Sequence, residues 1–174
     1  YEGIQYQYMA PQVFEDREWE YVQKHLRILS GFYGLLKPLD GVVPYRLEMQ
    51  AKLSVGESSN LYDYWADDIC RELEKETDCL INLASKEYSQ CVEKYLSGHI
   101  RMITCIFGEE SAGKIIQKGT QAKMARGEMV RFLAEAGAEE PENMRDFDRL
   151  GYQYREDLSN EEKYVFLKGG TERC

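Results

Sequence analysis

The sequence lacks the features that would assign it to a membrane or to a familiar enzyme class. It has no apolar run of about 18 residues, which a membrane-spanning helix requires. The opening residues, YEGIQYQYMAPQ, lack the basic and then apolar layout of a signal peptide. The signatures GxSxG, GxxxxGK(S/T), HExxH and GxGxxG, and EF-hand loops, are also absent. We therefore expect a soluble cytoplasmic protein with no membrane partner.

Patterns that bind metals or form disulfides are scarce as well. The two histidines, His25 and His99, have no partner at metal-ligand spacing, and no CxxC pair occurs, so we expect no metal and no other cofactor. The number of cysteines is odd, which favours reduced thiols in a reducing cytoplasm over a disulfide framework. These cysteines are Cys70, Cys79, Cys91, Cys105 and Cys174.

The length and charge describe an ordinary globular domain with one basic segment. At 174 residues the chain is long enough for one domain with a sizeable core. Its net charge of -9 argues against wholesale coating of nucleic acid or of an anionic membrane. Residues 111–133 differ from the rest, because they carry five bases against one acid. The bases are Lys114, Lys118, Lys123, Arg126 and Arg131, and the acid is Glu128.

Hydrophobic periodicity and turn residues predict a single mixed α/β domain. The expected helices have N-caps near Asp16, at Asn60 and at Ser85, and a fourth helix covers 121–136. The expected strands are 79–84, 100–107, 151–155 and 163–168. HLRILSGFY fits either the end of the first helix or a short buried strand. A turn is expected at Ser111-Ala-Gly, and KIIQ is expected to connect it to the fourth helix.

The run PYRLEM is the first candidate for function. Pro44 biases the chain towards extended geometry, so the residues after it are expected to continue as a strand with alternating sides. Arg46 and Glu48 then share a face, opposite Tyr45 and Leu47. An arginine fork can grip a carboxylate or phosphate, and a neighbouring glutamate can orient that fork or take a proton. The alternative is a solvated strand face that contributes little energy.

Two glycines, Gly31 and Gly34, precede this run. Their Gly-x-x-Gly spacing invites comparison with the backbone clamp of some RNA-binding domains. That clamp is expected to be polar or basic, whereas the intervening residues here are phenylalanine and tyrosine. The preferred interpretation is tight turning or close packing, for which only glycine has room.

Six blocks of residues together resemble a known family. They are SGFYGLLKPLD (30–40), PYRLEMQAKL (44–53), NLYDYW (60–65), INLASKEY (81–88), AKMARGEMVRF (122–132) and FDRLGYQY (147–154). These blocks, in this order, resemble the YaaA family of bacterial peroxide-stress proteins. The resemblance implies a family-specific α/β fold and a cytoplasmic protein that protects DNA and proteins by limiting unincorporated iron. It also implies DNA as a partner of the full-length protein, through a helix-hairpin-helix element among other parts.

The family begins with a segment that carries a Ser-Pro-Ala-Lys-Thr motif, and that motif has no counterpart here. The resemblance therefore places residues 1–174 as the C-terminal two-thirds to three-quarters of a YaaA-like domain that is truncated at its N-terminus. The helix-hairpin-helix element is expected to belong to the part that precedes these residues.

The resemblance implies functional residues in three of the blocks. They are Tyr45, Arg46 and Glu48, then Asn82, Ser85, Glu87 and Tyr88, then Lys123 and Arg126. Asn82 and Ser85 stand where a strand leads into a helix, and the free N–H groups of a helix start favour an anion. The alternative for these two residues is helix capping alone.

The third block lies on the predicted fourth helix. Lys123 and Arg126 are three positions apart and share a helical face, which is either a phosphate-binding face or a solvated one. Gly127 beside them would let another backbone approach closely.

Two classes of function remain open from the sequence. The first is a DNA-binding protein of peroxide defence, in which Lys123 and Arg126 contact phosphates. The second is an enzyme on a small anionic or nucleotide-like substrate, with Glu48 or Glu87 as acid or base. Its cleft would be formed by PYRLEM, INLASKEY and AKMARG, with Arg46, Lys123 and Arg126 gripping the anion.

Overall fold

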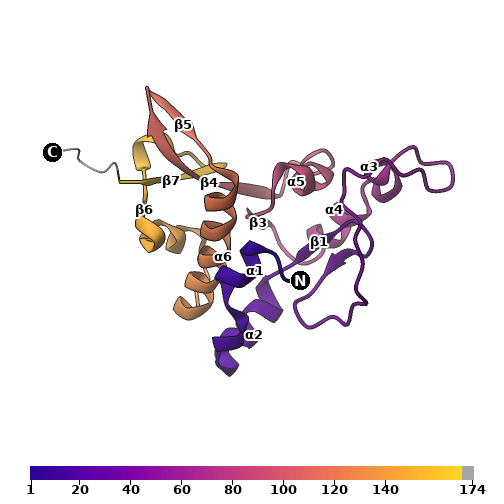
Figure 1. Ribbon diagram of the computed structural model, residues 1–174, viewed down its shortest axis with the longest axis horizontal. Helices are drawn as coiled ribbons and strands as arrows, with labels where there is room; N and C mark the ends of the chain where they lie inside the picture. The colour runs from indigo at the N-terminus through magenta and orange to yellow at the C-terminus, as the bar shows by residue number, and fades with distance from the viewer. Residues whose placement is uncertain (170–174) are drawn as a thin grey trace. The chain divides into compact units, whose positions relative to one another are not determined.

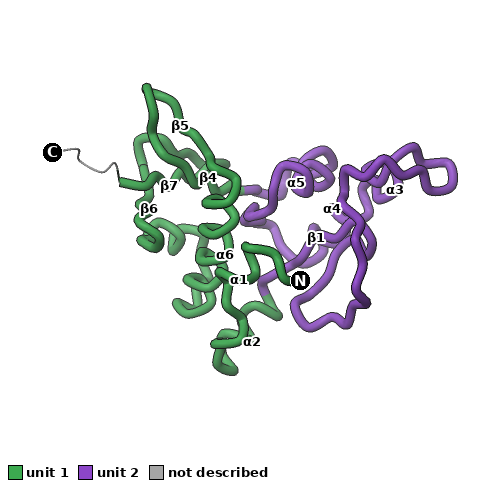
Figure 2. The backbone as a smooth tube through the Cα atoms, viewed as in Figure 1, with its two compact units in different colours: residues 1–24, 103–174 green, residues 25–102 purple. Residues whose placement is uncertain are grey.

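The computed structural model describes residues 1–169 and has the mixed α/β architecture that the sequence predicts (Figure 1). Backbone contacts divide the chain into two compact units, which are coloured separately in Figure 2. Unit 1 contains Tyr1–Lys24 and Ile103–Cys174, and unit 2 contains His25–Met102. Cys174, one of the cysteines expected to be reduced, lies outside the described residues.

The helices of unit 1 bring the first residues of the chain against the basic segment. They are α1 (Ile4–Met9), α2 (Asp16–His25, which ends at the boundary of unit 2) and α6 (Gly119–Ala136), with short 3-10 helices η1 (Pro11–Val13), η2 (Pro141–Asp146), η3 (Arg149–Gly151) and η4 (Glu156–Leu158). Helix α1 packs along α6 (Figure 1). As predicted, α6 stops at Gly137, whose φ of 59° is a left-handed helix end. Asp16 is the first residue of α2 rather than its N-cap.

A sheet completes unit 1. Four of its five strands lie mainly in this unit: β4 (Arg101–Ser111), β5 (Lys114–Ile116), β6 (Tyr152–Tyr154) and β7 (Lys163–Lys168). Strand β7 runs parallel to β4 and antiparallel to β6, and β5 pairs with the far end of β4. The turn predicted at Ser111-Ala-Gly is present, with Ala112 and Gly113 in left-handed conformations. The KIIQ connection is not irregular as expected, because β4 extends beyond 107 and β5 folds back on it.

Aromatic rings fill the core of unit 1. Phe107 of β4 is fully buried and stacks on Phe166 of β7, with 5.1 Å between the ring centroids. Tyr152 and Phe147 meet the Phe107 ring edge-on, at 5.5 Å and 5.8 Å. Rings in such contacts stabilise a core beyond the area that they bury. The aromatic strands predicted near the end of the chain therefore form the centre of this unit.

Unit 2 consists of short elements joined by long irregular segments. The elements are β1 (Ile28–Ser30), β2 (Gly34–Leu36), α3 (Leu61–Trp65), α4 (Asp68–Glu74), β3 (Cys79–Asn82) and α5 (Lys86–Glu93). Strands β1 and β2 form an antiparallel hairpin, so of the two interpretations of HLRILSGFY the short strand is correct. The single helix expected after Asn60 is instead two helices, because Ala66 adopts a non-helical φ of 41°.

The core of unit 2 gathers side chains from most of these elements. Met49, Leu61, Ile69 and Val92 are buried in one cluster. Asn60 caps α3 as predicted, since its side chain accepts a hydrogen bond from the Asp63 N–H.

The cysteines that the structure describes form no disulfide. Cys70, Cys91 and Cys105 are buried and Cys79 is half-buried, as expected for reduced cysteines. Burial raises the pKa of Cys70 and of Cys91 to about 11, so both remain protonated thiols at neutral pH. Within residues 1–169 no helix combines the length and the apolar character needed to cross a bilayer.

Candidate functional site

The PYRLEM segment is irregular and is not a strand. Residues 41–48 pair with no other strand in the described structure, so the predicted continuation as a strand is wrong. The predicted alternation of sides is nevertheless present. The inward side chains are Tyr45, Leu47 and Met49, and the exposed ones are Arg46, Glu48 and Gln50.

The turn that contains Gly31 and Gly34 holds this segment. A Cβ atom on Gly31 would lie 2.8 Å from the Leu47 carbonyl oxygen, and one on Gly34 would lie 2.8 Å from the Trp65 ring. Gly34 also has a φ of 75°, which L residues rarely adopt. The Trp65 indole N–H donates a hydrogen bond of 3.0 Å to the Gly31 carbonyl. Close packing, rather than an RNA clamp, therefore accounts for both glycines.

Ser30 and an aromatic cluster fix the position of Tyr45. The Ser30 hydroxyl accepts the N–H of Tyr33 at 2.9 Å and shares a hydrogen bond of 2.5 Å with the Tyr45 hydroxyl. The rings of Phe32 and Tyr33 lie 5.4 Å and 5.6 Å from that of Tyr45. Phe32 is 54% exposed, so one apolar ring of this cluster faces solvent. Sequence reasoning did not select Ser30, although it lies in the shared SGFYG block.

Arg46 and Glu48 lie on the same side, as the alternation predicts, but they form a loose pair. Their nearest nitrogen and oxygen are 4.0 Å apart, and the side chains are 92% and 58% exposed. Such a pair contributes little to stability. The guanidinium of Arg46 therefore presents its donors to solvent.

The end of β3 and the start of α5 carry the second block. Asn82 is buried, and its side-chain oxygen accepts the Ala84 N–H at 3.0 Å, which closes a tight turn. Ser85 is the N-cap of α5 by position, as predicted, but its side chain makes no capping hydrogen bond. Its carbonyl oxygen accepts the first N–H groups of the helix, from Tyr88 and Ser89, at 2.9 Å.

The first turn of α5 contacts the end of the PYRLEM segment. The Gln50 N–H donates to the Glu87 carboxylate at 3.3 Å. Burial raises the pKa of the Tyr88 phenol, and the negative charge of Glu87 adds to this rise, while a hydrogen bond with the Met49 backbone opposes it. Glu48 acts on Tyr88 electrostatically as well. The structure therefore brings the PYRLEM and INLASKEY residues together within unit 2.

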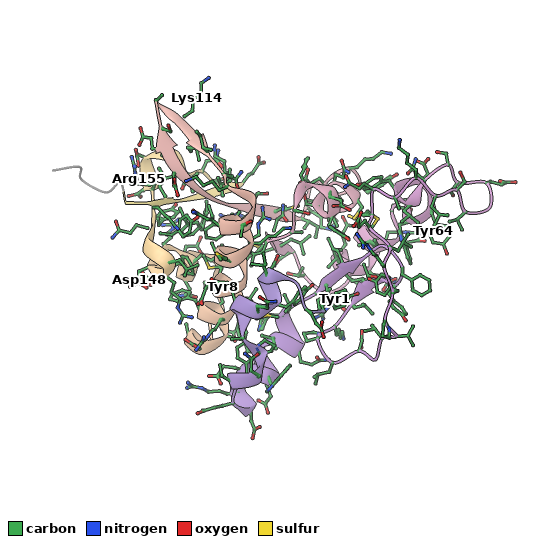
Figure 3. The ribbon with its side chains drawn as sticks, viewed as in Figure 1. Tyr1, Tyr8, Tyr64, Lys114, Asp148 and Arg155 are labelled. Atoms are coloured by element: carbon green, nitrogen blue, oxygen red, sulfur yellow. The ribbon has the colours of Figure 1, made fainter. Side chains whose placement is uncertain are left out.

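The third block lies in unit 1, on α6, and its two cations differ. Lys123 is exposed, whereas Arg126 is half-buried and its Nε atom is buried without a hydrogen-bond partner. Burial lowers the pKa of the Arg126 guanidinium. Other bases of the 111–133 segment are paired, since Lys118 contacts Glu109 and Arg131 contacts Glu135, each at 2.7 Å. Lys114 lies at the exposed tip of the β4–β5 hairpin (Figure 3).

Comparison with known proteins identifies the family. A family model described as "Peroxide stress protein YaaA" matches residues 1–158. The chain therefore belongs to the YaaA peroxide-stress family, which confirms the resemblance in its sequence blocks.

Three similar curated proteins are named UPF0246 proteins. One from Desulfitobacterium hafniense (strain Y51) is 59% identical over 99% of this chain and 69% of its own length. One from Agathobacter rectalis is 60% identical over 95% of this chain and 67% of its own length. One from Pediococcus pentosaceus is 52% identical over 97% of this chain and 67% of its own length. The chain thus spans about two thirds of the length of these relatives, and the interpretation of 1–174 as one truncated domain stays a prediction.

Proposed function

We propose that this protein acts in cytoplasmic peroxide defence, where it protects DNA and proteins from oxidation by limiting unincorporated iron. The observation that carries this proposal is the match of residues 1–158 to the YaaA peroxide-stress family. The buried, protonated thiols of Cys70 and Cys91 are poorly suited to react with peroxide themselves, because the thiolate is the reactive form. An indirect route of protection, through iron, is consistent with this chemistry.

The proposal predicts a change in cellular iron. In cells that lack the native gene, expression of this chain is expected to restore survival of a hydrogen peroxide challenge and to lower unincorporated iron relative to an empty vector. Iron is measured by electron paramagnetic resonance of whole cells treated with a chelator. Restored survival with unchanged iron would contradict the iron route, and failure of both would remove the peroxide role.

DNA binding is the second part of the proposal. The chain is acidic overall, so phosphate contacts need local cations that are not already neutralised. Lys123 is exposed, with no ion pair among the described residues, and Arg126 stands one helical turn away. We propose these two side chains as phosphate contacts.

The salt dependence of DNA binding tests this part. Each phosphate contact releases counterions, so log affinity falls with log salt at a slope near -0.9 per contact. Replacing Lys123 and Arg126 together by glutamine is expected to flatten this slope by about 2 units and to weaken binding similarly for all sequences. The measurement is fluorescence anisotropy of a labelled duplex over about 50 to 200 mM salt.

Lys24→Gln is the matched control for loss of one charge, because Lys24 is also an exposed lysine of unit 1. Its slope is expected to equal that of the wild type. An unchanged slope in the double variant would exclude these residues as DNA contacts.

The alternative is an enzyme on a small anionic or nucleotide-like substrate. What favours it is the arrangement in unit 2, where Glu48 and Glu87 both act on the half-buried Tyr88 phenol and the Arg46 guanidinium faces solvent. Groups with perturbed pKa values beside carboxylates are typical of acid–base sites. Native mass spectrometry of the full chain purified from cells would reveal a retained small anion under this alternative, and none under DNA binding alone.

A further inference from the structure

Arg126 occupies a position in α6 where an apolar residue is expected. Positions 122, 126, 129 and 133 follow the 4,3,4 spacing of one helical stripe. Ala122, Met129 and Leu133 are all buried, with exposed fractions of 3%, 0% and 6%. Arg126 therefore places a guanidinium within the stripe that α6 buries.

No carboxylate balances this guanidinium among residues 1–169. The two acids of α6 beyond Arg126 are engaged by other arginines. Glu128 pairs with Arg149 at 3.1 Å, and Glu135 pairs with both Arg149 and Arg131. The group that interacts with Arg126 electrostatically is Cys105 of β4. Burial raises the pKa of the Cys105 thiol to about 12, so this partner is neutral at physiological pH.

A half-buried charge with no counter-charge destabilises a fold, and an apolar side chain of similar size would cost less. The Arg126 Nε–H has no acceptor either, which adds the penalty of an unsatisfied buried donor. An anion bound by the guanidinium would compensate its charge, because the planar donors of the guanidinium match two oxygens of one oxyanion. The exposed Lys123 one turn earlier supplies a second positive charge, which suits a dianion better than a monoanion.

We propose that Arg126 anchors a binding site for a phosphate monoester dianion, with Lys123 at its solvent side. This inference concerns the same two side chains as the proposed DNA contacts but assigns them a different ligand, and the experiments below are chosen so that either proposal can fail without the other. The same chemistry is available from two sources, a free phosphate compound or the 5′-phosphate at a DNA end.

Thermal unfolding of the full chain tests the site with inorganic phosphate as the probe. Phosphate far above its dissociation constant is expected to raise the wild-type Tm by about 5 °C relative to chloride at equal ionic strength. Arg126→Met is expected to abolish this rise and to melt no lower than the wild type in chloride, since it removes an uncompensated charge. Lys123→Gln, the matched control for loss of one positive charge, is expected to keep part of the rise.

Three outcomes would overturn the proposal. They are no phosphate-induced rise in the wild type, an equal rise in Arg126→Met, and a Tm of Arg126→Met that falls by several degrees in chloride, which would assign the guanidinium to packing. If Arg126→Met fails to fold, phosphate binding is tested by phosphorus NMR of inorganic phosphate in the presence of the wild type or of Arg126→Lys. Line broadening that is lost in Arg126→Lys supports a planar grip, and equal or absent broadening contradicts it.

Two further titrations separate the sources and keep this site distinct from DNA binding. If adenosine monophosphate raises the Tm as inorganic phosphate does, the natural ligand is a free phosphate compound. If a duplex raises the Tm only when its 5′ ends carry phosphate, the ligand is the phosphate at a DNA end. A duplex that protects equally with and without terminal phosphate, while phosphate and adenosine monophosphate do nothing, would support the DNA proposal and overturn this one.

Discussion

Replacing Gly127 with alanine is expected to destabilise the protein by about 3 kcal/mol. A Cβ atom at this position would lie 2.1 Å from the Gln5 carbonyl oxygen and 2.9 Å from the Met9 amide nitrogen. Both are backbone atoms of α1, so no side-chain rotation can relieve the overlap. Helix α1 would have to move away from α6, and unit 1 would lose packing around the buried Met9 side chain.

Urea unfolding of the wild type and the variant measures this effect. Gly119→Ala is the matched control, because Gly119 belongs to the same helix and a Cβ atom there meets nothing within 4 Å. It is expected to be neutral or to stabilise by up to about 1 kcal/mol, as alanine favours helices more than glycine does. Similar unfolding curves for both variants would show that the contact between α1 and α6 does not constrain position 127.

The close approach at Gly127 was predictable from the sequence, but its partner was not. A glycine inside an otherwise regular helix indicates that another backbone comes near. The partner, α1, is a helix of only six residues with one buried side chain, Met9, so hydrophobic periodicity gives no signal for it. The pairing also joins residues that are far apart in the sequence, which local patterns do not encode.

The PYRLEM segment shows a similar limit within the candidate site. Alternating polarity correctly predicted which of its side chains point inward, although the segment is irregular. Strand formation needs a partner strand as well, and here the contacts are made instead by the Gly31 turn and by Glu87. The sequence therefore predicted the candidate residues and their sides, but not the packing that holds them.

Arg126 illustrates the opposite case, in which local spacing was informative but insufficient. Lys123 and Arg126 were correctly placed on one helix, with a shared phosphate-binding or solvated face as the two interpretations. The structure adds that Lys123 is exposed and Arg126 is half-buried among apolar neighbours. Local spacing does not show whether such an arginine is paired with a carboxylate, because this depends on residues far away in the sequence. Here Arg149 pairs with Glu128 and Glu135, the acids that follow Arg126 on α6.

Replacing Gly31 with alanine is expected to disturb the candidate site of unit 2 without changing any of its proposed functional side chains. The added Cβ atom would lie 2.8 Å from the Leu47 carbonyl oxygen and 3.3 Å from the Glu48 carbonyl carbon. The segment that carries Tyr45, Arg46 and Glu48 would have to shift away from the turn. We expect a loss of about 1 to 3 kcal/mol in stability, as for other overpacked sites.

The functional effect should exceed what this loss of stability explains, because Tyr45 and Glu48, which both act electrostatically on Tyr88, would change position. Gly41→Ala is the control, since Gly41 lies in the same unit, has no positive φ and leaves room for a Cβ atom. Survival of peroxide is compared in cells that lack the native gene, at matched protein levels and at a temperature where both variants remain folded. Full protection by a folded Gly31→Ala variant would show that the precise position of the PYRLEM segment is not needed for peroxide defence, and the functional residues would then have to be sought on α6.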